Sequence, residues 1–132
     1  MSQTIEQSTL FSEANLFSQG VLAGEFIFLA QDARGSDGMI GAAQSAEQQT
    51  RLCLFNLDIA LHALGQSTAD VVSLSVFLSD YRDAATVAKT LRERFGNDGP
   101  AVNFVGVCAL EGGCHLRMDA IATTSEIGRA HV

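Results

Sequence analysis

Hydrophobic and polar positions along the chain alternate in ways that separate strands from helices. From Asp70 to Leu78, apolar and polar residues alternate with a period of two, which predicts a strand covered on one face. The expected covered face holds Val72, Leu74, Val76 and Leu78, and the opposite face holds Val71, Ser73, Ser75 and Phe77. Residues 16–30 contain two short apolar runs divided by Ala23-Gly24-Glu25, which predict a hairpin.

Two further segments carry apolar residues at helical spacing. Residues 45–64 contain no glycine or proline, and a predicted buried stripe runs through Cys53, Leu57, Ala60 and Leu64. Gly65 is expected to end this helix. Asp80 is a good N-cap for a second helix, which Gly96 and Gly99-Pro100 end. The buried stripe of this second helix is predicted to be Ala84, Val87, Leu91 and Phe95.

The last third of the chain predicts two strands, around residues 102–109 and 114–122, that turn through Glu111-Gly112-Gly113. The resulting order, β-β-α-β-α-β-β, predicts a two-layer α+β domain with two helices on one face of a mixed sheet. The expected helix-covered face of the final strand is Leu116, Met118, Ala120 and Ala122. The other face, with His115, Arg117, Asp119 and Ile121 beside Val71 and Phe77, is too apolar to remain in water, so we expect other subunits to cover it.

Composition limits the possible partners and location. The 132 residues suit one domain over 1–132, with residues 1–15 and 125–132 expected to be flexible. A net charge of −7 disfavours nucleic-acid binding, because it repels a phosphate backbone. The longest apolar runs are too short for a membrane span, and the polar N-terminus does not resemble a signal peptide. Three cysteines without a CxxC pair favour reduced thiols in a cytoplasm.

Several short segments, in their order and spacing, resemble a known family. They are Gln19-Gly20-Val21, Gln31, Gln49, Arg51, Asn56, Gly65, residues 70–80, Ala85-Thr86-Val87, Pro100-Ala101 and Asp119-Ala120-Ile121-Ala122. Together they resemble the Rid family of reactive-intermediate deaminases, also called the YjgF family, from about Phe17 to Ala122. The resemblance implies a homotrimer of chorismate-mutase-like subunits with a ligand cleft at each subunit interface. It also implies hydrolysis of imines or enamines released by pyridoxal-phosphate enzymes, without a cofactor.

The chain departs from this family at the positions that bind substrate. In such deaminases an arginine directly after Pro-Ala grips the substrate carboxylate, and a glutamate on the last strand positions water. Val102 stands in place of that arginine and cannot pair with a carboxylate, whereas Asp119 stands for the glutamate. Phe17, Leu29 and Phe104 replace a tyrosine, a small hydroxyl residue and a cysteine. The resemblance therefore implies an apolar cleft with Asp119 as the catalytic carboxylate and Gln31, Phe17, Leu29, Ala30, Val102 and Phe104 as substrate-binding residues.

Each candidate residue also has a structural interpretation. Asp119 could instead pair with Arg117, Arg51 or a backbone amide, and Gln31 could anchor a loop. Cys108 and His115 would be neighbours if the final strands form a tight hairpin, which would allow a thiolate nucleophile. A buried thiol and a structural histidine are the favoured interpretation of that pair, and zinc binding with Cys114 is disfavoured because no second ligand pair matches.

Two functions from different classes follow from these residues. The first is an enzyme that hydrolyses a small, weakly charged imine, enamine or carbonyl compound, with Asp119 handling water or a proton. The second is a metabolite-binding trimer that has lost the deaminase activity, which the replacement of the arginine by Val102 supports. Nucleic-acid processing, a label that some members of the family carry, is disfavoured by the acidic charge.

Overall fold

The computed structural model describes residues 2–4, 20–35, 39 and 44–124. The strands are β1 (Ser2–Thr4), β2 (Gly20–Ala23), β3 (Phe26–Asp32), β4 (Val71–Leu78), β5 (Ala101–Gly106) and β6 (Leu116–Thr123). The α-helices are α1 (Ala46–His62) and α2 (Ala84–Phe95). The short strand β1 was not expected from the sequence. Residues 5–15 and 125–132, for which flexibility is predicted, lie outside the described residues.

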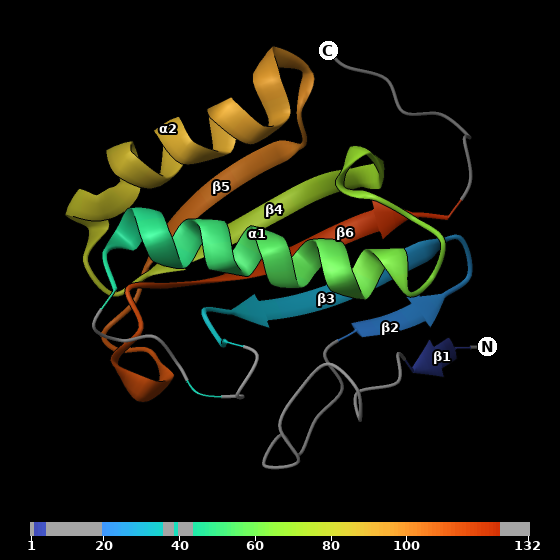
Figure 1. Ribbon diagram of the computed structural model, residues 1–132, viewed down its shortest axis with the longest axis horizontal. Coiled ribbons are helices and arrows are strands. Elements are labelled where there is room, and N and C mark those ends of the chain that lie inside the picture. Colours follow the sequence, from blue (N-terminus) through green and yellow to red (C-terminus); the bar gives the residue numbers. More distant parts are fainter. Residues whose placement is uncertain (1, 5–19, 36–38, 40–43, 125–132) are drawn as a thin grey trace.

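The strands form one sheet in the order β1-β2-β3-β6-β4-β5. Neighbouring strands are antiparallel except for β4 and β5, which are parallel. Both helices lie on the same side of this sheet (Figure 1). The prediction of a two-layer α+β domain with a mixed sheet is therefore confirmed. None of the helices in the described ranges is long and apolar enough to cross a membrane.

The prediction that the last two strands pair with each other is wrong. Strand β4 lies between them, so that Ser75 pairs with Asn103 of β5 on one side and with Asp119 of β6 on the other. The cause is the helix that precedes β5. A helical crossover returns the chain parallel to the strand it left, so β4, α2 and β5 form a β-α-β unit. Residues 107–115 then carry the chain past the end of β4 to begin β6.

The core fills the space between the helices and the sheet. On β6 its members are Leu116, Met118, Ala120 and Ala122, as predicted, and on α1 they include Cys53, Leu57 and Ala60. Leu64, beyond the end of α1, is partly buried against the same cluster. On α2 Val87 and Leu91 are buried, while Ala84 and Phe95 are partly buried against the core. The amphipathic stripes thus identified the faces on which both helices pack.

Strand β4 departs from the predicted alternation at its start. The register with β6 shifts between Val71 and Ser73, which marks a bulge. Val71 consequently faces the core and is fully buried, whereas Val72 is only half-buried. The prediction that Val71 lies on the uncovered face is therefore wrong. A bulge adds one residue to a strand, so it reverses the facing of the residues before it.

Polar side chains of α1 hold two strand ends in place. Asn56 donates hydrogen bonds from Nδ2 to the carbonyl oxygens of Asp32 (3.2 Å), the last residue of β3, and of Arg34 (2.7 Å), just after it. Gln49 accepts a 2.8 Å bond at Oε1 from the backbone N–H of His115, just before β6. The helix itself begins in a capping box between Ser45 and Gln48. These bonds fix the strands that carry Ala30 and Asp119.

A close approach joins the end of α2 to the start of β5. A Cβ atom added at Gly99 would lie 2.6 Å from the Cβ atom of Phe95, well inside van der Waals contact. The equivalent atom at Gly106 would meet Tyr81 at 3.6 Å, which is an ordinary contact. Only the first glycine is therefore needed for packing.

We predict that Gly99→Ala destabilises the protein by about 1–3 kcal/mol, the usual cost of overpacking. Gly106→Ala is the matched control and should change the free energy of unfolding by less than about 0.5 kcal/mol. Urea unfolding at one protein concentration, followed by circular dichroism, measures both values. Equal stability of the two variants would contradict the assigned contact between residue 99 and Phe95.

Candidate functional site

The sheet face that turns away from both helices, here called the open face, carries Asp119. Asp119 of β6 lies opposite Ala30 of β3 and opposite Ser75 of β4, and Ser75 lies opposite Asn103 of β5. Residues paired across a sheet point to the same side, so these four residues form a row on the open face. The row combines one carboxylate with small and polar neighbours.

Asp119 forms an ion pair within its own strand. Arg117 donates a 3.0 Å hydrogen bond from Nη2 to Oδ1 of Asp119, and the two side chains are 43% and 46% exposed. The pairing with Arg117 that we considered from the sequence is thus present. Arg51, the other arginine considered, pairs with Glu47 and Glu93 instead. A half-exposed pair contributes little stability, typically about 0–1 kcal/mol, so Asp119 can exchange this partner for a ligand or a water molecule.

Apolar side chains surround this carboxylate on the open face. Phe28 lies opposite Ile121 and remains 47% exposed, and Phe26 is 45% exposed. Val105 of β5 lies opposite Phe77 and is 36% exposed. Large apolar groups gathered on one face of a domain mark a surface for association.

Two predicted site residues point to the opposite side of the sheet. Leu29 pairs with Ala120 and Gln31 pairs with Met118, both on the helix-covered face. Leu29 is 3% exposed and Gln31 is 2% exposed. Neither polar atom of the Gln31 side chain has a hydrogen-bond partner in the described structure, so Gln31 does not anchor a loop in this way. Phe17 lies outside the described residues.

Val102 and Phe104 come together in an apolar pocket between α2 and β5. This α2–β5 pocket has a volume of about 200 Å³ and is lined by Ala88, Leu91, Arg92, Phe95, Gly96, Asn97, Gly99, Pro100, Val102 and Phe104. Val102 pairs with Leu74 and Phe104 with Val76, so both point to the helix side of the sheet. The sequence pattern assigned Leu91 and Phe95 to the core and gave no role to Arg92. Leu91 and Arg92 follow Ala88 by one helical turn and Phe95 follows it by two, and this spacing on one side of α2 was the available signal.

Within one chain the predicted site residues therefore fall into separate groups. Asp119 and Ala30 belong to the open face, and Val102 and Phe104 belong to the α2–β5 pocket on the other side of the sheet. The expectation that they line one cleft remains a prediction, and only an arrangement of several chains could fulfil it.

The cysteines do not form the nucleophilic arrangement that a hairpin would have allowed. Cys108 follows β5 and is exposed, while His115 precedes β6, and β4 separates the two strands. Burial raises the pKa of the Cys53 and Cys114 thiols, which keeps them protonated and unreactive. Within the described ranges, no group of three or more His, Cys, Asp or Glu side chains lies close enough to hold a metal ion.

Comparison with known proteins shows where the chain belongs. Residues 8–124 match the model of the endoribonuclease L-PSP family. A RutC family protein of Pyrococcus horikoshii is 33% identical over 110 residues, which cover 80% of this chain and 85% of that protein. The 2-iminobutanoate/2-iminopropanoate deaminase of Dermatophagoides farinae is 24% identical over 109 residues, covering 80% and 83%.

Solved structures agree with this assignment. The crystal structure of TdcF from Escherichia coli with bound serine superposes with a TM-score of 0.81 at 27% identity, covering 93% of this chain and 99% of that one. A conserved Rid family protein from Yersinia pestis superposes with a TM-score of 0.85 at 25% identity, covering 93% and 99%. The match to the family model, the sequence identity to relatives and the shared fold show that this chain is a member of the endoribonuclease L-PSP family, which includes the YjgF and Rid proteins.

Proposed function

We propose that this protein is a cytoplasmic homotrimer that hydrolyses a small, weakly charged imine, enamine or related carbonyl compound without a cofactor. The site would lie between chains, with Asp119 of one copy facing the α2–β5 pocket of the next. The observation that carries this proposal is that the carboxylate and the apolar pocket lie apart within one chain. Asp119 and Val102 lie on opposite faces of one sheet, and each is partly open to solvent.

The pocket size supports a site completed by a second chain. Pockets for drug-sized ligands usually measure about 300–1,000 Å³. The α2–β5 pocket, at about 200 Å³, would hold a small metabolite or one end of a larger cleft. The exposed phenylalanines of the open face, Phe26 and Phe28, supply the apolar surface that a neighbouring copy would cover. A cyclic trimer would place this face of each chain against a different surface of the next.

The proposed reaction uses Asp119 as the base. Its carboxylate would accept a proton from water while the water oxygen bonds to the imine carbon and the C=N π electrons move to nitrogen. The protonated carboxyl would return the proton to the nitrogen, which gives a carbinolamine. The carboxylate would then carry the hydroxyl proton of the carbinolamine to the same nitrogen, so that the C–N bond breaks, the carbonyl forms and ammonia leaves. An enamine first takes a proton on carbon and loses one from nitrogen, which converts it to the imine. A positioned carboxylate typically accelerates such proton transfers about 10²–10⁴-fold.

The relatives support the reaction class, and this chain's own residues narrow the ligand. One relative is a 2-iminobutanoate/2-iminopropanoate deaminase, and another binds serine in its crystal structure. In this chain Val102 and Phe104 make the pocket wall apolar, so the ligand body is expected to be hydrocarbon-rich. Gln31, Leu29, Ala30 and Phe17 remain predicted contributors. A nuclease activity is not proposed, because the net charge of −7 opposes binding to phosphates.

A non-catalytic binding trimer is the second candidate, favoured by Val102 in the position of an arginine and by the pairing of Asp119 with Arg117. It shares the assembly and the pocket with the first candidate, and it differs only in turnover.

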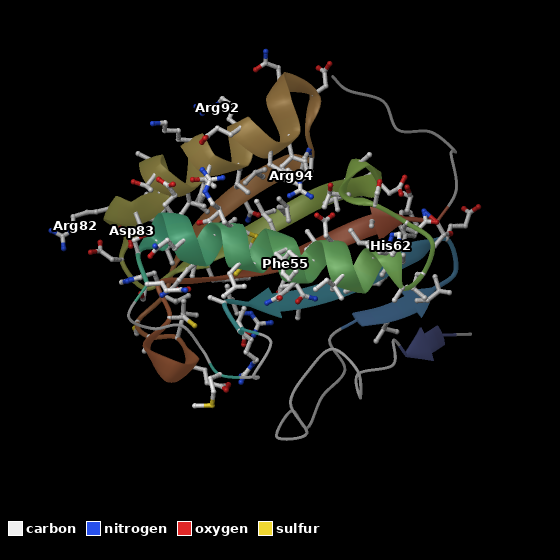
Figure 2. All side chains as sticks on the ribbon, in the orientation of Figure 1. Phe55, His62, Arg82, Asp83, Arg92 and Arg94 are labelled. Atoms are coloured by element: carbon white, nitrogen blue, oxygen red, sulfur yellow. The ribbon has the colours of Figure 1, made fainter. Side chains whose placement is uncertain are left out.

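Phe28→Asp is predicted to dissociate the trimer, because a charge would be buried against another copy without a partner. Phe55→Asp is the matched control, since Phe55 is 57% exposed on the outer side of α1 (Figure 2). Light scattering after size exclusion should give about three times 14.0 kDa for the wild type and the control. A 14.0 kDa wild type, or a trimer that persists in Phe28→Asp, would refute the assignment of this face.

Asp119→Asn is predicted to lower kcat for imine hydrolysis by about 10²-fold or more, because an amide cannot accept the proton from water. Asp119→Glu restores a carboxylate and should recover part of the loss. Imines generated in situ by an amino-acid oxidase supply the substrate, and competition with semicarbazide reports their removal. Undiminished turnover in the Asp119→Asn trimer would exclude this residue as the base, and saturable binding without turnover in the wild type would favour the binding protein.

A further inference from the structure

One cation lines the α2–β5 pocket. Arg92 lies one helical turn after Ala88 on α2 and borders the pocket with Val102 and Phe104. Among the lining residues, all within the described part of the chain, it is the only one with a charged side chain. The other polar side chain is that of Asn97, from the turn between α2 and β5. The pocket thus has an apolar lining with one exposed arginine at its border.

Arg92 differs from the other arginines of the described residues in its partners. The other arginines of the described residues each form an ion pair: Arg34 with Glu111, Arg51 with Glu93, Arg82 with Asp80, Arg94 with Asp58 and Arg117 with Asp119. No ion pair or side-chain hydrogen bond involves Arg92 within those same residues. In the described part of a chain with a net charge of −7, Arg92 thus lies beside an apolar pocket without an acidic partner.

The neighbouring arginine shows how different the environment is on the other side of the helix. Arg94, two residues later, lies between α2 and α1, where it pairs with Asp58, while Arg92 lies on the side of α2 away from α1 (Figure 2). Residues two apart on a helix are separated by about 200° around its axis. The two arginines have the same chemistry and similar positions along α2, but only Arg92 reaches the pocket.

Arg92 offers a ligand carboxylate the charged partner that Val102 does not. A carboxylate buried against Val102 would lose its hydration without gaining a partner. A carboxylate at the α2 side of the pocket would instead meet a planar guanidinium, which can donate two parallel charged hydrogen bonds. The hydrocarbon part of the same ligand could then lie on Val102 and Phe104.

We infer that Arg92 is the residue that selects the ligand, and that the ligand carries one carboxylate on an apolar body. This inference rests on the proposed function for the site, but it concerns recognition and does not require turnover. A ligand of this class carries a single negative charge, which the guanidinium of Arg92 would balance at the α2 wall of the pocket. The imine or enamine of a branched or aromatic amino acid fits this description.

The test measures binding of isovalerate, a branched monocarboxylate, and of isovaleramide, which has the same shape without the charge. Isothermal titration or ligand-observed NMR is applied to the wild type, Arg92→Gln and the matched control Arg94→Gln. Loss of a bidentate charged contact should weaken isovalerate binding to Arg92→Gln about 10-fold or more. Isovaleramide should bind all three proteins within about twofold of one another, and Arg94→Gln should bind isovalerate like the wild type.

Several results would overturn the inference. They are no saturable binding of isovalerate by the wild type, equal binding by the wild type and Arg92→Gln, or an equal loss for isovaleramide in Arg92→Gln. Arg92→Lys keeps the charge but not the planar fork, so partial recovery is expected. If isovalerate binding depends on Arg92 but no imine is turned over, the proposed reaction fails while the recognition by Arg92 stands.

Discussion

The helices cover only one face of the sheet, and the rest of the molecule depends on that asymmetry. Burial of apolar side chains beneath α1 and α2 stabilises the domain, because each helix presents a single apolar stripe to the strands. The opposite face receives no such cover. It retains half-exposed phenylalanines, Phe26 and Phe28, around a carboxylate whose only ion-pair partner within the described residues is Arg117. A domain with this arrangement is compact but has a surface suited to association.

The parallel pairing of β4 and β5 gives the two sides of the sheet different roles. Because α2 crosses from β4 to β5, the edge strand turns Val102 and Phe104 toward the helix, where they form an apolar pocket with Leu91 and Phe95. The same pairing leaves Asn103 in a row with Ser75 and Asp119 on the open face. We therefore propose that Asp119 of one chain acts at the α2–β5 pocket of a neighbouring chain. In that pocket Arg92 of α2 would supply the positive charge that Val102 of β5 cannot.

The sequence was sufficient for the elements whose signals are local. The stripe of Cys53, Leu57 and Ala60 and the alternation of β6 depend on residues a few positions apart, and the structure agrees with them. The neighbours of each strand were harder to predict, because an alternating pattern shows which face of a strand is covered but not which strand pairs with it. The bulge at Val71 was missed because valine at positions 71 and 72 allows either facing.

The candidate site was predicted less well, for a related reason. Val102 and Phe104 were expected together and do line one pocket, but Leu29 and Gln31 share their side of the sheet beneath the helices, away from Asp119. Arg92 was overlooked because a charged residue on an amphipathic helix is ordinarily solvated. Its place beside the pocket depends on the end of α2 lying over the start of β5, a contact that no local pattern encodes.

Co-expression of two inactive chains tests the sharing of the site most directly. One chain would carry Asp119→Asn, and the other would carry Val102→Trp, which fills the α2–β5 pocket. If each site takes its carboxylate from one copy and its pocket from the next, random mixing of equal amounts should restore about a quarter of wild-type turnover. Mixed oligomers that form, as shown by differently tagged chains purifying together, yet remain inactive would contradict a site built between copies.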